Sequence, residues 1–167
     1  MAVGLHGVRL AQSQPGDRVL VIGAGPIGLA TAYWARRLGA GRIAVTAGST
    51  RRASLAMTMG ADVFLDPADA SPEAAARALG GMPDVVYECV GVEGMIARSI
   101  DYVRPRGTVV VLGLCSRQDH FMPFTLVAKE ARLQASAFYD RRDFEVCADA
   151  LDKDADTQRA MVTDVIH

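Results

Sequence analysis

Residues 18–30 read RVLVIGAGPIGLA, and this stretch decides the fold. An apolar, β-branched run meets a G-x-G-x-x-G motif made by Gly23, Gly25 and Gly28, and a helix-forming segment follows without a break. In a strand–turn–helix unit of this kind, the first glycine permits a tight turn and the second lets a pyrophosphate approach the backbone. The third lets the helix pack close to the strand. The stretch therefore predicts a phosphate-binding turn.

We expect the helix after this turn to begin at Pro26, because a proline in the first helical turn loses no hydrogen bond. Ile27 and Gly28 then lie in the same first turn. The unpaired N–H groups and the positive dipole end of the helix would face the phosphates. Gly23, Gly25, Pro26, Ile27 and Gly28 are thus candidate cofactor-binding residues.

The rest of the chain alternates short apolar runs with helix-forming segments. We expect strands at 19–22, 42–46, 63–65, 84–89, 108–112 and 132–138, and an edge strand at 161–166 is possible. The expected helices are 2–11, 26–38, 53–59, 71–80, 93–102, 124–129 and 140–151. The pattern predicts an α/β fold of the Rossmann type, doubly wound, with a mostly parallel six-stranded sheet and helices on both faces.

The composition is that of one ordinary globular domain. The chain has 167 residues, is 50% hydrophobic and has a formal net charge of −1, which gives no electrostatic reason to expect nucleic acid or a membrane as partner. Cys89, Cys115 and Cys147 form no C-x-x-C pair, so neither a disulfide scaffold nor a four-cysteine zinc site is expected. A cytoplasmic location follows as the default. His6 and His120 lack spaced partners, so no metal ligand is expected.

Five motifs extend well beyond the glycine turn: PGDRVLVIGAGPIG at 15–28, LGA at 38–40, MGAD at 59–62, DVVYECVG at 84–91 and RPRGTVVVLGL at 104–114. Together they resemble the zinc-type medium-chain dehydrogenase/reductase family, which includes alcohol, polyol and threonine dehydrogenases. The resemblance implies that residues 1–167 are the dinucleotide-binding domain of a longer polypeptide, and that the N-terminal catalytic zinc domain lies outside this chain.

The resemblance also implies what the parent protein does. It would transfer a hydride between an alcohol or carbonyl substrate and nicotinamide, using zinc and a substrate pocket from the missing domain. We expect no catalytic residue in this chain, and the fragment alone would be inactive. The family further implies a homodimer, in which residues 131–138 extend the sheet between subunits; an internal strand is the alternative.

The residues after the second strand favour NADP(H) over NAD(H). NAD-preferring sheets carry an acidic residue there, which bonds the ribose 2′-OH, but Ala47 takes that position here. Ser49, Arg51 and Arg52 follow, and a guanidinium group can bind a 2′-phosphate with two hydrogen bonds. The alternative is that both arginines lie in the first turn of a solvated helix and contact nothing, so NAD(H) stays possible.

Two later turns complete the candidate site. Cys89 and Val90 follow the fourth strand, and Gly113 and Leu114 follow the fifth, at the edge where ligands bind in open α/β sheets. The first pair would lie beside the adenosine or ribose, and the resemblance places the second pair at the nicotinamide end. Simple packing explains each position equally well, and Cys89 fits a buried small side chain better than a reactive thiol.

Two other classes of function share a glycine-rich turn. A non-catalytic dinucleotide-sensing module would carry the same turn. A methyltransferase also uses a glycine-rich turn, but the complete G-x-G-x-x-G motif and the missing acid after the second strand disfavour it. No tyrosine has a lysine four residues later, which argues against a short-chain dehydrogenase. Asp84 and Glu88 flank the fourth strand and receive no role.

Overall fold

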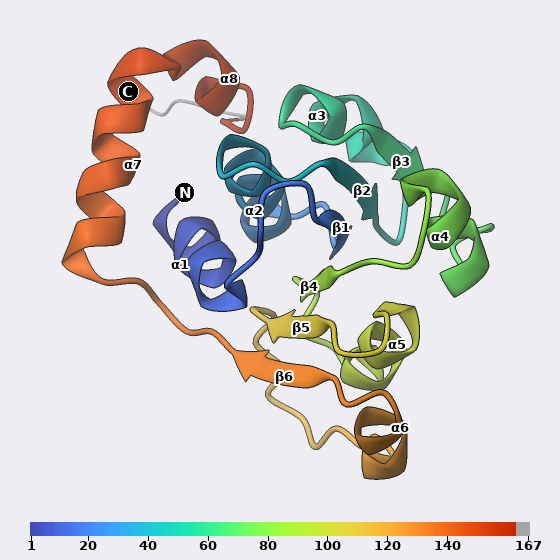
Figure 1. Ribbon diagram of the computed structural model, residues 1–167. Helices are drawn as coiled ribbons and strands as arrows, with labels where there is room; N and C mark the ends of the chain where they lie inside the picture. The colour runs from blue at the N-terminus through green and yellow to red at the C-terminus, as the bar shows by residue number, and fades with distance from the viewer. Residues whose placement is uncertain (163–167) are drawn as a thin grey trace.

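Six parallel strands form one sheet in the computed structural model, which describes residues 1–162 (Figure 1). The strands are β1 (Arg18–Ile22), β2 (Arg42–Thr46), β3 (Val63–Leu65), β4 (Val85–Glu88), β5 (Thr108–Val111) and β6 (Arg132–Ala135). Their order is β3-β2-β1-β4-β5-β6, and every neighbouring pair is parallel. The predicted doubly wound, Rossmann-type fold is confirmed, and the sheet is wholly rather than mostly parallel.

Helices cover both faces of this sheet (Figure 1). They are α1 (Ala2–Ala11), α2 (Pro26–Arg37), α3 (Ala53–Thr58), α4 (Pro72–Leu79), α5 (Met95–Tyr102), α6 (Pro123–Ala128), α7 (Arg141–Lys153) and α8 (Ala155–Arg159), and a 3-10 turn spans Thr50–Arg52. Within residues 1–162, no helix has both the length and the apolar character needed to cross a membrane.

The two layers follow from the alternation of side chains along each strand. In β1, Val19 and Val21 pack into a core with α1, α2, α3 and α7, whereas Leu20 and Ile22 pack into a second core with α4 and α5. A strand that is buried on both faces must be apolar at every position, which explains the uninterrupted run after Arg18. This burial fixes the central strand from which the glycine turn emerges.

The predicted end of the sixth strand is wrong. β6 stops at Ala135, and the last ladder bond beyond it runs from the Ser136 N–H to the Val111 carbonyl at 2.9 Å. Phe138 has φ 60, a left-handed conformation that breaks the extended path. Alternating side chains alone could not reveal this, because the pattern continues past the last paired residue.

Other boundaries differ for local reasons. α5 begins at Met95 rather than at residue 93, because Gly94 before it has φ 83 and cannot continue a helix. The sequence pattern does not predict α8, which spans Ala155–Arg159. Residues 161 and 162 are not part of a strand, and the remainder of the possible edge strand, 163–166, lies outside the described residues.

Asp84 organises the end of the sheet opposite the glycine turn. Its Oδ2 accepts the Arg18 backbone N–H at 2.8 Å and the Arg18 Nε–H at 2.9 Å, and its Oδ1 accepts the Arg104 Nε–H at 2.5 Å. One carboxylate therefore ties the start of β1 to the approaches of β4 and β5. The role of Asp84 is structural, and it lies away from the candidate site.

Candidate functional site

The glycine turn leaves β1 beside β4, where the strand order reverses and where open α/β sheets bind their ligands. Gly23 has φ 110, a conformation that favours glycine, and its N–H donates to the Thr46 carbonyl at 2.7 Å. A Cβ on Gly28 would lie 1.8 Å from the Gly23 carbonyl oxygen. The first and third glycines are thus required by the protein's own backbone, as the motif predicts.

Gly25 differs from the other two glycines because it faces open space. Apart from Gly25 itself and its neighbours in the chain, no heavy atom of residues 1–162 comes within 4 Å of a Cβ built there. Gly25 is the N-cap of α2, and Pro26 and Ile27 start the helix. The N–H groups of the first turn have no partners within the helix, so they are free to bind an anion in this space. The turn is a cradle with the shape and polarity that a diphosphate needs.

A cavity of about 290 Å³ adjoins this cradle beyond the end of β2. Its lining residues are Ala24, Ala47, Gly48, Ser49, Arg51 and Arg52. The two arginines lie in the 3-10 turn, and Arg52 Nη1 donates to the Ala24 carbonyl at 3.1 Å. Arg52 therefore contacts the glycine turn, contrary to the alternative in which both arginines contact nothing. The structure brings Ser49, Arg51 and Arg52 to one cavity.

The turns after β4 and β5 contact each other at the same edge. A Cβ on Gly91 would lie 2.5 Å from the Leu114 nitrogen, and a Cβ on Gly113 would lie 2.2 Å from the Gly91 nitrogen. Val90 and Leu114 beside this crossing are 41% and 80% exposed, so they are accessible to a ligand. Sequence reasoning named the segment 89–91 and the pair Gly113 and Leu114. It did not predict that Gly91 lies against Gly113, because this contact joins segments that are distant in the chain.

Cys89 fits the interpretation as a packed side chain. Its Sγ lies 3.9 Å from the Thr31 hydroxyl, and it packs against the core. Burial raises the pKa of the Cys89 thiol to about 12, so the nucleophilic thiolate is disfavoured. The residue shapes the turn rather than supplying chemistry.

Sequence reasoning gave no role to Glu88, which the structure places at the centre of this edge. The residue is 1% exposed, and its Oε1 accepts the N–H groups of Val90 at 2.7 Å and Gly91 at 2.9 Å. A single acidic residue in an otherwise apolar buried strand was the available signal, since a buried carboxylate must find hydrogen-bond donors.

One cluster of possible metal ligands lies apart from the glycine turn. Among residues 1–162, His6, Asp140 and Asp143 form the one group of three potential ligands. The buried Asp143 carboxylate already accepts from Arg9, from His6 Nδ1 at 2.7 Å and from the Asp140 N–H at 3.2 Å. These contacts join α1 to α7 and occupy the donor atoms, so the group does not fit a catalytic zinc ion.

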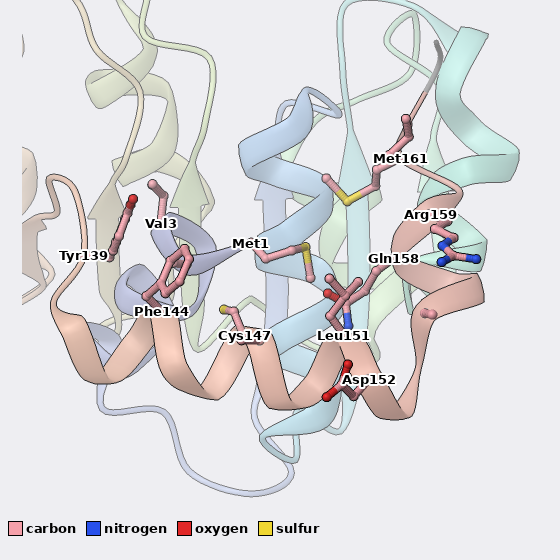
Figure 2. A pocket seen from close by; sticks show the side chains of 14 residues that line it. Met1, Val3, Tyr139, Phe144, Cys147, Leu151, Asp152, Gln158, Arg159 and Met161 are labelled. Carbon is pink, nitrogen blue, oxygen red and sulfur yellow. The ribbon is translucent and has the colours of Figure 1, made fainter. Parts of the chain in front are cut away.

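A larger cavity, about 920 Å³, lies between α1, α7 and α8 (Figure 2). Tyr139 and Phe144 stack there with ring centroids 6.1 Å apart, and Leu151 and Met161 extend the apolar wall. None of the predicted cofactor residues lines this cavity. A diphosphate needs N–H donors and cations, so the smaller, polar cavity beside the glycine turn is the better candidate site.

The fold and the glycine turn define a doubly wound, Rossmann-type α/β domain. A family profile described as zinc-binding dehydrogenase matches residues 26–153, and the chain belongs to this family. This finding confirms the resemblance inferred from the sequence motifs.

Comparisons with individual proteins agree with this family. Sorbitol dehydrogenase of Ovis aries is 42% identical over 120 residues, which cover 70% of this chain and 34% of that protein. The structure of an alcohol dehydrogenase from Thermotoga maritima superposes with a TM-score of 0.88 at 27% identity, covering 97% of this chain and 47% of that one. A zinc-binding dehydrogenase from Sinorhizobium meliloti, bound to NADP, has a TM-score of 0.80 at 29% identity, covering 99% and 54%. The chain therefore spans about a third to a half of the length of these relatives.

Proposed function

We propose that this chain binds NADP(H) and serves as the cofactor domain of a zinc-dependent alcohol or polyol dehydrogenase. The observation that carries the proposal is the open cradle at Gly25, next to a cavity lined by Ser49 and two arginines. The similarity to sorbitol dehydrogenase supports the class of substrate, and the relative bound to NADP supports the class of cofactor.

The proposed role of the chain is to hold the cofactor rather than to activate the substrate. The N–H groups at the start of α2 bind the diphosphate, and Arg51 and Ser49 bind the 2′-phosphate. The turns at Cys89–Val90 and Gly113–Leu114 orient the ribose and nicotinamide. The zinc ligands and most of the substrate pocket belong to other parts of the whole protein. The described cysteines are all free, which supports a reducing cytoplasm.

Arg51 provides the direct test of cofactor choice. Replacing Arg51 with alanine is expected to weaken NADPH binding roughly tenfold to hundredfold, because one charge-assisted contact to the 2′-phosphate is lost. Binding of NADH, which lacks this phosphate, should not change. Calorimetric titration of the chain with both cofactors measures the difference.

Two companion variants sharpen the test. Arg52→Ala should weaken both cofactors, because Arg52 also holds the Ala24 carbonyl of the glycine turn. Arg77→Ala removes an exposed arginine from α4 and should affect neither. Tighter binding of NADH than of NADPH by the parent chain would reject the NADP(H) preference and leave dinucleotide binding intact.

The alternative function is a non-catalytic dinucleotide-sensing module. Such a module would have the same phosphate-binding turn as a dehydrogenase, and it would differ in the other parts of the full-length protein. Cysteine, histidine and glutamate ligands in the full-length sequence, together with NADPH-dependent reduction of a carbonyl, would support the dehydrogenase. Their joint absence would support the sensor. The family match leaves the methyltransferase interpretation without support.

We also propose that the whole protein forms a homodimer through the β6 edge. β6 ends the sheet, and α6 beside it leaves Phe124 and Val127 72% and 70% exposed. A second copy would cover both the unpaired strand edge and these side chains.

Light scattering at micromolar concentration is expected to report a dimer for the unsubstituted chain and a monomer for its Val127→Asp variant. Leu38→Asp, which changes an exposed leucine after α2, is the matched control and should stay dimeric. A monomeric parent would contradict the proposed dimer for this chain.

A further inference from the structure

Glu88 occupies an unusual position for an acidic residue. It is the last residue of β4, and its sheet neighbours are Ile22 of β1 and Val111 of β5. By alternation it shares with Val86 the face that packs against α4 and α5. None of the ion pairs among residues 1–162 includes it. A buried carboxylate without a cation is costly, so its other contacts should explain its presence.

Those contacts lead to the turns that follow β4 and β5. The side-chain Oε1 accepts the N–H groups of Val90 and Gly91, at 2.7 and 2.9 Å. The main-chain carbonyl of the same residue accepts the N–H groups of Leu112 and Gly113, at 2.8 and 3.0 Å. Glu88 therefore holds the turn after β4 with its side chain and the turn after β5 with its backbone.

The two turns pack so closely that only one relative position is possible. A Cβ on Gly113 would lie 2.4 Å from Glu88 Oε2, as well as overlapping the Gly91 nitrogen. Gly91 itself has φ 72, a conformation that the two hydrogen bonds to the carboxylate stabilise. Without the carboxylate, the N–H groups of Val90 and Gly91 would lose their acceptor. The turn after β4 would then no longer be held in place by the side chain of residue 88.

The strand order identifies the half of the ligand that is affected. In this fold, each half of the sheet binds one mononucleotide, and the 2′-phosphate site after β2 assigns the adenosine to the β1–β3 half. The turns after β4 and β5 then face the nicotinamide riboside. Of the two neighbours expected for the turn after β4, the adenosine and the ribose, this assignment favours the ribose. We propose that Glu88 is a positioning residue whose carboxylate sets these two turns against the nicotinamide half of the cofactor. This inference rests on the proposed function.

The inference is tested by comparing the affinity for NADPH with the affinity for 2′,5′-ADP, which is one half of that cofactor. In Glu88→Leu, which removes the acceptor at similar size, NADPH affinity is expected to fall roughly tenfold or more. Affinity for 2′,5′-ADP, which carries only the adenosine half, should stay at the parent value. A merely structural role would lower both affinities together. Glu88→Gln keeps one acceptor oxygen and should restore most of the NADPH affinity.

Amide hydrogen exchange supplies a second readout in the free chain. Exchange at Val90 and Gly91 should accelerate in Glu88→Leu and stay slow in Glu88→Gln. Glu93→Gln, which changes an exposed carboxylate in the same loop, should alter neither exchange nor binding. If Glu88→Leu does not fold by circular dichroism, Glu88→Asp, with its shorter side chain, should give the same selective loss of NADPH.

The outcomes separate the two proposals. A parent chain that binds neither NADPH nor 2′,5′-ADP would overturn the proposed function and this inference with it. A parent that binds both, with a Glu88 variant that loses both equally or keeps its NADPH affinity, would overturn only the positioning role.

Discussion

Replacing Gly25 with alanine is expected to abolish dinucleotide binding without destabilising the chain. In the proposed complex, the diphosphate occupies the space beside Gly25, and a methyl group placed there would hold it away from the N–H groups of α2. We expect affinity for NADPH to fall roughly a hundredfold or more, because the loss removes several charge-assisted hydrogen bonds at once. Titration of the parent and variant with NADPH measures the change.

Stability should not suffer, because Gly25 has φ −74 and ψ 177, values that alanine adopts freely. Restricting the unfolded chain should even add about 0.4–1 kcal/mol to the free energy of unfolding. Gly28→Ala is the contrasting variant: its Cβ overlaps the Gly23 carbonyl, so both binding and thermal stability should fall. Unchanged NADPH affinity in Gly25→Ala would mean that the diphosphate does not pass this turn.

Asp84→Asn is expected to lower the free energy of unfolding by about 2–3 kcal/mol, because it removes the half-buried charge that Arg18 and Arg104 share. Urea unfolding at neutral pH measures the loss. Glu145→Gln removes an exposed carboxylate paired with Arg141 on α7 and should have almost no effect. A near-zero effect of Asp84→Asn would show that backbone pairing alone holds the strand starts in register.

The carboxylate of Asp84 also makes the free energy of unfolding depend on pH. Burial alone would raise the pKa of Asp84, but the hydrogen bonds from Arg18 and Arg104 outweigh it and lower the pKa from 3.8 to about 2. Because the pKa of Asp84 is lower in the folded state, the carboxylate stabilises the fold at any pH above its pKa in the unfolded chain. This stabilisation is lost as the pH falls through the pKa in the folded state. Asp84 should therefore contribute about 2 kcal/mol above pH 4, declining toward pH 2. Asp84→Asn should flatten this part of the stability profile.

Much of the architecture could be predicted because its signals are local. The apolar run before Gly23, the proline at the start of α2 and the glycines after the helices each act within a few residues. The sequence motif also predicted the separate roles of Gly23, Gly25 and Gly28. The end of β6 was predicted less well, because the left-handed conformation of Phe138 has no counterpart in the alternation of side chains.

The missed features of the site all join segments that are distant in the sequence. Arg52 reaches back to Ala24, and the Gly91 turn lies against Gly113. Glu88 gains its role only when the β4 and β5 turns are placed side by side. Residue types and spacing could identify these residues as candidates, but only the folded sheet shows which backbone groups they contact.

The Gly23–Gly28 turn is already fixed in the free chain by the bond to Thr46, the close approach of α2 and the contact from Arg52. A ligand that arrives at a rigid receptor spends little of its interaction energy on ordering the protein. In the proposed complex, the diphosphate would therefore meet a surface that needs little further ordering, and the enthalpy of association would report new contacts rather than coupled folding. Selectivity between cofactors can then be altered at the arginine cavity without rebuilding the turn.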